Sequence, residues 1–213
     1  ALVPVLAFLA VLVLMDSFKL VPLRAVVRLI LAGAAAAFLG ARLHAAILEA
    51  GLVSGTVLSR YVAPLTEESL KALPVVWLLF RRRVGFLVDA AILGFAVGTA
   101  FAVVENVEYL RALGASSVFL WIVRGFGTAV LHGGTTSILA VVARGLEDRR
   151  PGAGLAVVLP GLAAAVAIHS LFNHFILPPV LTTILLFVTL PVLLVAVFAR
   201  SEKGTRDWLG AGF

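Results

Sequence analysis

The chain contains no cysteine, and only 13% of its 213 residues are charged. The absence of cysteine excludes disulfides, a cysteine nucleophile, Cys-ligated zinc and iron–sulfur clusters. A soluble domain carries about 25% charged and about 45–50% apolar residues, whereas 62% of this chain is hydrophobic and its mean hydropathy is +1.14. The composition therefore excludes a soluble globular enzyme and a disordered chain, and it indicates a protein that crosses the membrane several times.

Long apolar runs make up most of the sequence, and a helix needs about 20 such residues to cross a hydrocarbon core of roughly 30 Å. The period-two alternation of barrel strands is absent. Seven runs qualify as spans: 1–17, 23–48, 53–80, 86–110, 116–143, 154–177 and 180–199. We therefore predict an all-α, polytopic transmembrane helix bundle of about seven spans, which forms a single integral membrane domain over residues 1–213.

The net charge of +6 comes from basic residues that stand between the apolar runs. They lie in alternate connections, which is typical of loops on the cytoplasmic side of a membrane rather than of a nucleic-acid-binding patch. This alternation predicts an extracytoplasmic N-terminus and a cytoplasmic C-terminus. The expected partner is the lipid bilayer and not nucleic acid, and the expected location is a prokaryotic plasma membrane. The basic loops occupy 19–28, 81–83, 144–150 and 200–206.

Four of the predicted spans carry ionisable side chains deep inside apolar sequence. Such a group costs several kcal/mol in the hydrocarbon layer unless it faces a partner or water, so it marks a functional site by default. At about 1.5 Å per helical residue, these groups lie roughly 18–22 Å from the basic loops and share one layer of the membrane. They are Glu67, Glu68 and Lys71 in the third span, Glu105 in the fourth, His132 in the fifth, and His169 with Asn173 in the sixth.

Several of these side chains are four residues apart and therefore share a helix face, as in the pair His169 and Asn173. Two histidines with one or two carboxylates match the ligand chemistry of catalytic zinc sites, in which another carboxylate activates water. The HExxH spacing is absent, so spacing alone leaves metal binding open. His44 and His174 stand alone on their spans, and we interpret them as structural histidines.

These motifs resemble those of the PrsW family of intramembrane proteases, and the resemblance covers residues 60–175. Phe172 stands where that family usually has tryptophan. The CAAX-type membrane proteases are less similar, because Ala72 replaces an arginine of their motif and Glu105 replaces a histidine. The matching motifs are EExxK at 67–71, GFA at 94–96, ENxxY at 105–109, His132, and HxxxN at 169–173.

The resemblance implies a membrane-embedded metalloendopeptidase with a four-helix catalytic core at 60–175. Its expected substrate is a single-span membrane protein of the anti-sigma-factor type, cut near the extracytoplasmic side. A divalent metal, zinc, is the expected cofactor. On this hypothesis Glu67 or Glu68 is the general base, Lys71 keeps one of them charged, and Asn173 donates to the oxyanion. The expected metal ligands are Glu105, His132 and His169.

Other functions remain open at this point. One is a metal-free membrane protease of the CAAX type that activates water with a glutamate and a histidine. Another is a proton-coupled transporter, for which inverted repeats would be typical, although the sequence shows none. The last is a non-catalytic scaffold that keeps a protease-like fold.

Overall fold

The computed structural model describes residue 10 and residues 21–113 and 127–211, and every regular element within that part is helical. The first predicted span, 1–17, and the beginning of the fifth lie outside the described residues. The long helices are α2 (Leu23–Glu49), α4 (Ala63–Phe80), α5 (Leu87–Leu113), α7 (Ala129–Arg149), α8 (Leu159–Asn173) and α9 (Pro179–Ala211). The short ones are α3 (Gly55–Val57), the π-helix η1 (Leu58–Val62) and the 3₁₀-helix η3 (Gly154–Val157).

Three of the described helices, α2, α5 and α7, are long and apolar enough to cross a membrane. The apolar helix α8 is shorter, with 15 residues. Helix α4 has 18 residues and is not among these three, because it carries three charged side chains near its start. The third predicted span is not one regular α-helix, because the short helix α3 and the π-helix η1 precede α4 along it. The described part of the chain is thus all-helical, as predicted, with three helices that could span a membrane, while the number seven and the orientation stay predictions.

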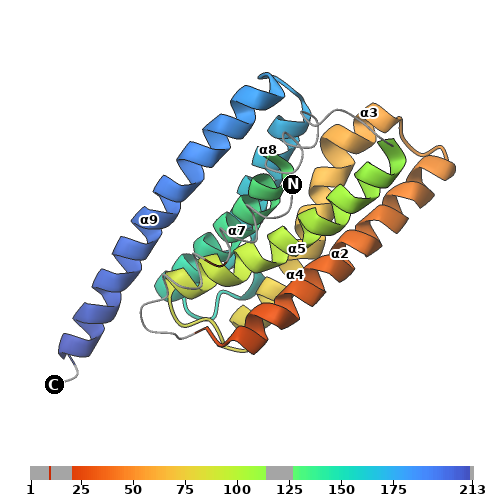
Figure 1. Cartoon of the computed structure of the whole chain (residues 1–213). Helices are drawn as coiled ribbons and strands as arrows, with labels where there is room; N and C mark the ends of the chain where they lie inside the picture. The colour runs from red at the N-terminus through yellow and green to blue at the C-terminus, as the bar shows by residue number, and fades with distance from the viewer. Residues whose placement is uncertain (1–9, 11–20, 114–126, 212–213) are drawn as a thin grey trace.

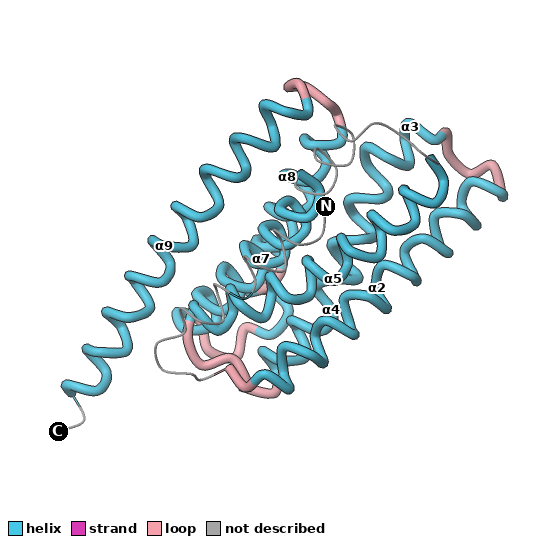
Figure 2. The backbone as a smooth tube through the Cα atoms, viewed as in Figure 1, coloured by secondary structure: helices cyan, strands magenta, loops and turns pink. Residues whose placement is uncertain are grey.

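Helix α5 is the centre of the bundle. It packs against α2 on one side and α7 on the other, and α8 lies against α7 (Figure 1). Every residue from 88 to 102 is buried, which fits a segment that is apolar on all faces. The backbone trace shows α9 along the outer side of the bundle (Figure 2), where it contacts α5 and α7. The central helix therefore meets most of the others directly.

Close approach of these helices depends on glycine. A Cβ atom added at Gly98 would lie 2.0 Å from the carbonyl oxygen of His132 on α7, and one at Gly94 would lie 2.6 Å from that of Thr136. On α2, a Cβ at Gly33 would lie 2.2 Å from the carbonyl oxygen of Val97. Small residues let helix backbones pack closely in membranes, where van der Waals contact drives association. Gly94 and Gly98, four residues apart, therefore form the face of α5 that packs against the α7 backbone.

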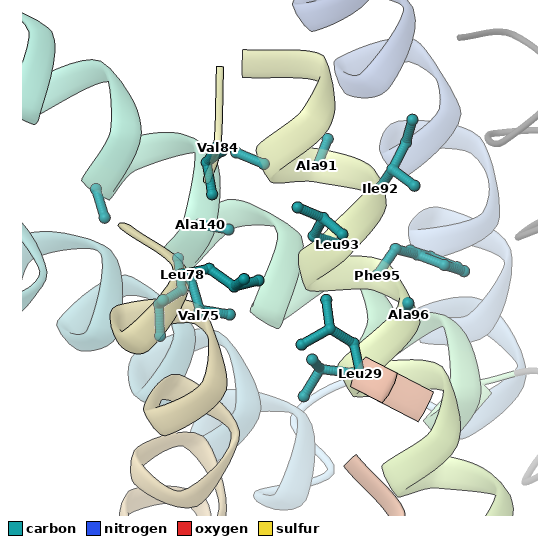
Figure 3. Packing of buried hydrophobic residues seen from close by; sticks show 14 of the residues in the cluster. Leu29, Val75, Leu78, Val84, Ala91, Ile92, Leu93, Phe95, Ala96 and Ala140 are labelled. Carbon is teal, nitrogen blue, oxygen red and sulfur yellow. The ribbon is translucent and has the colours of Figure 1, made fainter. Parts of the chain in front are cut away.

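The apolar core fills the half of the bundle around the first turns of α5. Branched and aromatic side chains of α5 meet those of α2, α4 and α7 there (Figure 3). Asp89 lies in the first turn of α5, and its Oδ2 accepts hydrogen bonds from the backbone N–H groups of Gly85 and Phe86 just before the helix. Residues labelled in the view include Leu29, Val75, Leu78, Ile92, Leu93, Phe95 and Ala140.

The two ends of the bundle differ in charge. At one end, α4 ends, α5 begins, α7 ends and α8 begins, and the loops there hold 81–83 and 149–150. Arg144 closes this end by donating from Nε and Nη2 to the Gly85 carbonyl, at 3.2 and 2.8 Å. We call this end the basic end. At the opposite end, α2 and α5 end, and α3 begins.

We predict that Gly98→Ala destabilises the protein, because the new methyl group would collide with the α7 backbone, which cannot move aside like a flexible side chain. Overpacking of this kind costs about 1–3 kcal/mol. The expected result is a lower thermal unfolding midpoint in detergent. Gly145→Ala is the matched control on α7, since its Cβ would lie 3.6 Å from Leu87 Cδ2, an ordinary contact. Equal midpoints for the two variants would contradict the packing argument.

Candidate active site

A group of polar side chains from α4, α5, α7 and α8 meets inside the bundle, and we call it the polar cluster. Within it, Glu68 and Lys71 are 0% exposed and His132 is 1% exposed. A buried charge is stable only when it is paired and hydrogen-bonded. The polar cluster consists of Glu67, Glu68, Lys71, Glu105, His132, Thr135 and His169.

Glu68 is the hub of the polar cluster. Its Oε1 lies 2.6 Å from Lys71 Nζ and 2.8 Å from His169 Nδ1, and it accepts a hydrogen bond from Thr135 Oγ1 at 3.2 Å. One carboxylate oxygen therefore joins α4, α7 and α8. Because Glu68 holds the Nδ1 side of His169, the Nε2 side of that ring is the one available for a ligand, an arrangement typical of metal-binding histidines.

His132 lies between a cation and a carboxylate. Lys71 Nζ is 2.9 Å from His132 Nδ1, and Glu105 Oε2 is 2.7 Å from His132 Nε2. Since an ammonium group can only donate, Nδ1 accepts, and the ring proton sits on Nε2, where it donates to Glu105. A metal bound at Nε2 would displace that proton, as metal binding to histidine generally does.

Glu67 faces the histidines from α4. Its Oε2 is buried, lies 3.9 Å from His169 Nε2, and has no hydrogen-bond partner among the described residues. Glu67, His132 and His169 each offer one ligand atom, and these atoms all lie within 4.8 Å of one another. Two imidazole nitrogens and a carboxylate oxygen suit a divalent ion such as zinc. The donor set and the orphaned oxygen therefore fit a metal.

A cavity of about 510 Å³ reaches the polar cluster from the end of the bundle opposite the basic end. Leu48 at the end of α2, Gly55 at the start of α3 and Tyr109 near the end of α5 line its outer part. Glu68 and Lys71 are not among its lining residues, so they lie behind the histidines. The cluster residues that line the cavity are Glu67, Glu105, His132 and His169.

The π-helix before α4 connects the cavity wall to α8. Ala63 donates its N–H to the Leu58 carbonyl, as a π-helix requires, and Pro64 has no N–H to donate. The Ser59 carbonyl therefore accepts from Asn173 Nδ2 at 2.9 Å, and α8 also reaches the next carbonyl through Ser170, at 2.6 Å.

The structure brings Glu67, Glu68, Lys71, Glu105, His132 and His169 together, whereas Asn173 lies nearer the mouth of the cavity, on the Ser59 carbonyl. The three ligand atoms that lie close enough together for a metal come from Glu67, His132 and His169, whereas Glu105 is hydrogen-bonded to His132. The expected ligand role of Glu105 stays a prediction. Spacing along the sequence does not show which of Glu67, Glu68 and Glu105 would bind a metal and which would act as a base, because these roles depend on which carboxylate reaches the cavity.

Sequence reasoning missed His44 of α2. This histidine lines the cavity, and its Nδ1 lies 3.8 Å from Glu67 Oε1. On its own span it has no polar neighbour at helical spacing, so it resembled His174, whose ring bonds to the Ser170 carbonyl and the Tyr61 hydroxyl. No pattern within α2 distinguished it, because its polar neighbours Thr66 and Glu67 lie on α4.

We predict that Lys71→Met destabilises the protein more than it alters the chemistry, because it leaves Glu68 as an unpaired buried charge. Breaking a buried pair in this way costs about 3–5 kcal/mol. The measurement is the unfolding midpoint of detergent-purified protein. Lys203→Met, an exposed lysine on α9, is the control and is expected to leave the midpoint unchanged. Similar midpoints for both variants would show that the pair does not hold the cluster.

Comparison with known proteins agrees with this geometry. A family model described as the PrsW family intramembrane metalloprotease matches residues 21–199, which include the whole polar cluster and His44. No curated protein and no solved structure gives a significant match. The match covers most of the chain, which confirms the resemblance found in the sequence motifs. The chain therefore belongs to the PrsW family of intramembrane metalloproteases.

Proposed function

We propose that this protease hydrolyses a peptide bond of a single-span membrane protein near the extracytoplasmic side of a prokaryotic plasma membrane. By resemblance to the family, the substrate is of the anti-sigma-factor type. The observation that supports this proposal is the convergence of Glu67, His132 and His169 ligand atoms within 4.8 Å, at the inner end of a cavity. The catalytic core proposed at residues 60–175 contains all of these groups.

We assign the metal to Glu67, His132 and His169, with zinc as the proposed ion. A divalent ion held there would act as a Lewis acid that polarises the scissile carbonyl. Glu68 would act on the site through His169, since their hydrogen bond sets which ring nitrogen faces the cavity. Lys71 keeps Glu68 charged and orients His132 from its other side.

Glu105 is the proposed general base, because it lines the cavity and its side chain is 22% exposed, so water can reach it. In hydrolysis it would take a proton from the attacking water while the water oxygen bonds to the carbonyl carbon. It would then pass that proton to the leaving amine nitrogen as the C–N bond breaks. The expectation from sequence, Glu67 or Glu68 as base and Glu105 as ligand, remains the alternative assignment for the same carboxylates.

Asn173 remains a proposed oxyanion donor, although it also has a structural contact. An amide nitrogen carries two hydrogens, and one of them is directed to the Ser59 carbonyl. The residue also lines the cavity, so the second hydrogen can serve a substrate oxygen there. Donation to a developing oxyanion typically contributes about 10²–10³ to the rate.

The position of the cavity supports cleavage near the extracytoplasmic face. The cavity opens away from the basic end, and basic loops lie on the cytoplasmic side of membrane proteins. The described residues at the cavity end include fewer arginines, namely Arg42, Arg60 and Arg111. A peptide bond just outside the hydrocarbon layer could therefore enter from that side.

One observation favours a second candidate, a metal-free protease. Glu105 and His132 already form a hydrogen-bonded pair at 2.7 Å, and such a pair can activate water without a metal. Membership of a metalloprotease family and the orphaned Glu67 oxygen favour the metal. The same membership argues against the proton-coupled transporter.

We predict that Glu105→Gln lowers kcat for cleavage of a single-span substrate by about 10²-fold or more, because the amide keeps the shape but cannot accept the proton. Glu67→Gln is expected to lose bound metal as well as activity. The assay uses detergent-purified protein, with mass spectrometry of the products and metal analysis of the enzyme.

Glu49→Gln, at an exposed position at the end of α2 outside the cavity lining, is the control and should cleave normally. A chelator should abolish cleavage, and added zinc should restore it. Activity that survives complete removal of metal would favour the metal-free candidate. Full activity in both Glu105→Gln and Glu67→Gln would contradict the proposed mechanism.

The orientation can be tested by exploiting the absence of native cysteine. We expect Pro178→Cys to react with a membrane-impermeant thiol reagent on intact cells, because this position joins α8 to α9 at the cavity side. Arg82→Cys and Arg206→Cys should react only after the membrane is opened. The reverse labelling pattern would reject the proposed topology.

A further inference from the structure

We propose that the cavity wall formed by α2 and α5 is a substrate subsite, which takes an apolar side chain next to the scissile peptide bond, and that Ala41 limits the size of that side chain. The proposal rests on the proposed function, because it describes where a residue of the cleaved protein binds. It holds for the metal-dependent and the metal-free mechanism alike. We call this surface the apolar wall, and it consists of Ala37, Ala41, Phe101 and Val104, which all line the cavity.

Helix α2 turns one regular face toward the cavity. Ala37, Ala41, His44 and Leu48 line the cavity, and their spacing along the chain places them on one side of the helix. Their exposure increases in that order, from buried Ala37 through half-buried Ala41 to exposed Leu48. The inner half of this face carries only methyl side chains, which leave space for a group of the substrate.

Phe101 of α5 forms the floor of the subsite. Its buried side chain packs with Ala37 and Val104 in a small apolar cluster. The His132 ring lies beside it, with 5.0 Å between the two ring centroids, and Lys71 Nζ is 5.0 Å from the Phe101 centroid. The apolar wall therefore begins directly beside a proposed metal ligand, and the polar cluster helps to hold its floor in place.

The apolar wall also borders both glutamates that line the cavity. A Cβ atom added at Gly40, the residue before Ala41, would lie 3.9 Å from Glu67 Cγ. Val104 directly precedes Glu105 on α5, and both residues line the cavity. Ligand pockets are typically apolar, with a few polar groups that fix the orientation of the ligand. A peptide bond held at these carboxylates would place one of its two flanking side chains against the apolar wall.

The separation of α2 and α5 is fixed by their backbones, which lie side by side (Figure 1). A Cβ atom added at Gly33 would lie 2.2 Å from the Val97 carbonyl oxygen, so the two helices are already in close contact one turn before the cavity begins at Ala37. A larger side chain at position 41 would therefore take its space from the substrate. One extra or missing methylene in an apolar pocket changes kcat/KM by about 10–200-fold.

The test compares kcat/KM for single-span substrates that differ at one of the two residues flanking the scissile bond, which mass spectrometry of the products locates. Each position carries alanine, leucine, phenylalanine or aspartate in turn. At one of the two positions, the wild type should cleave the leucine substrate at least about 10-fold better than the aspartate substrate, because leucine gains from burial and a carboxylate does not.

At that same position, Ala41→Leu should lower the ratio of kcat/KM for leucine over alanine by about 10–200-fold. Val104→Ala enlarges the apolar wall and should shift the preference the other way, toward phenylalanine over leucine. This second variant removes atoms and cannot overpack, so it tests the subsite even where Ala41→Leu yields little folded protein.

Ala46→Leu is the matched control, since it makes the same change at an exposed position of α2 outside the cavity lining. It should leave the leucine-to-alanine ratio as in the wild type. Unchanged ratios in Ala41→Leu and Val104→Ala, an equal change in Ala46→Leu, or equal cleavage of leucine and aspartate substrates at both positions would overturn the subsite while leaving the proposed function intact. A wild-type protein that cleaves none of the substrates would overturn the proposed function, and the subsite with it.

Discussion

The ion pair between Glu68 and Lys71 is the interaction on which the rest of the site depends. Both side chains are fully buried, and their 2.6 Å contact neutralises two charges that have no access to water. Because a carboxylate has more than one lone pair to satisfy, the same oxygen also takes His169 and Thr135. The ammonium group likewise extends to His132. The need to satisfy one buried pair thus fixes the ring orientation of both histidines.

Backbone carbonyls near this pair also have their hydrogen bonds supplied by a neighbouring helix. Where Pro64 and η1 interrupt the regular helical pattern, side chains of α8 supply the donors that the carbonyls of η1 need. Unpaired backbone carbonyls are costly in a membrane, so this exchange ties α8 to the start of α4. The tie sets the distance between His169 and the glutamates, and the irregular segment also forms part of the cavity wall.

The glutamates differ in how far they lie from the cavity, and this difference separates their proposed roles. Glu68 lies behind the histidines and serves them, whereas Glu67 and Glu105 reach the cavity and are the two candidates for direct work on substrate or metal. Helix α2 also reaches the cavity, through His44, although its composition is that of an ordinary membrane span.

The sequence by itself determined the helical class, the membrane setting, the family and the set of buried polar residues, because each of these follows from local composition or from motifs. The packing role of Gly94 and Gly98 could also be predicted from the sequence, since small residues at helical spacing form one face. Tertiary structure alone decided which glutamate faces the cavity, that Asn173 reaches the Ser59 carbonyl, and that His44 approaches Glu67. These contacts join residues 23 to 114 positions apart or depend on helix rotation, and spacing along one helix carries no information about the rotation of its neighbours.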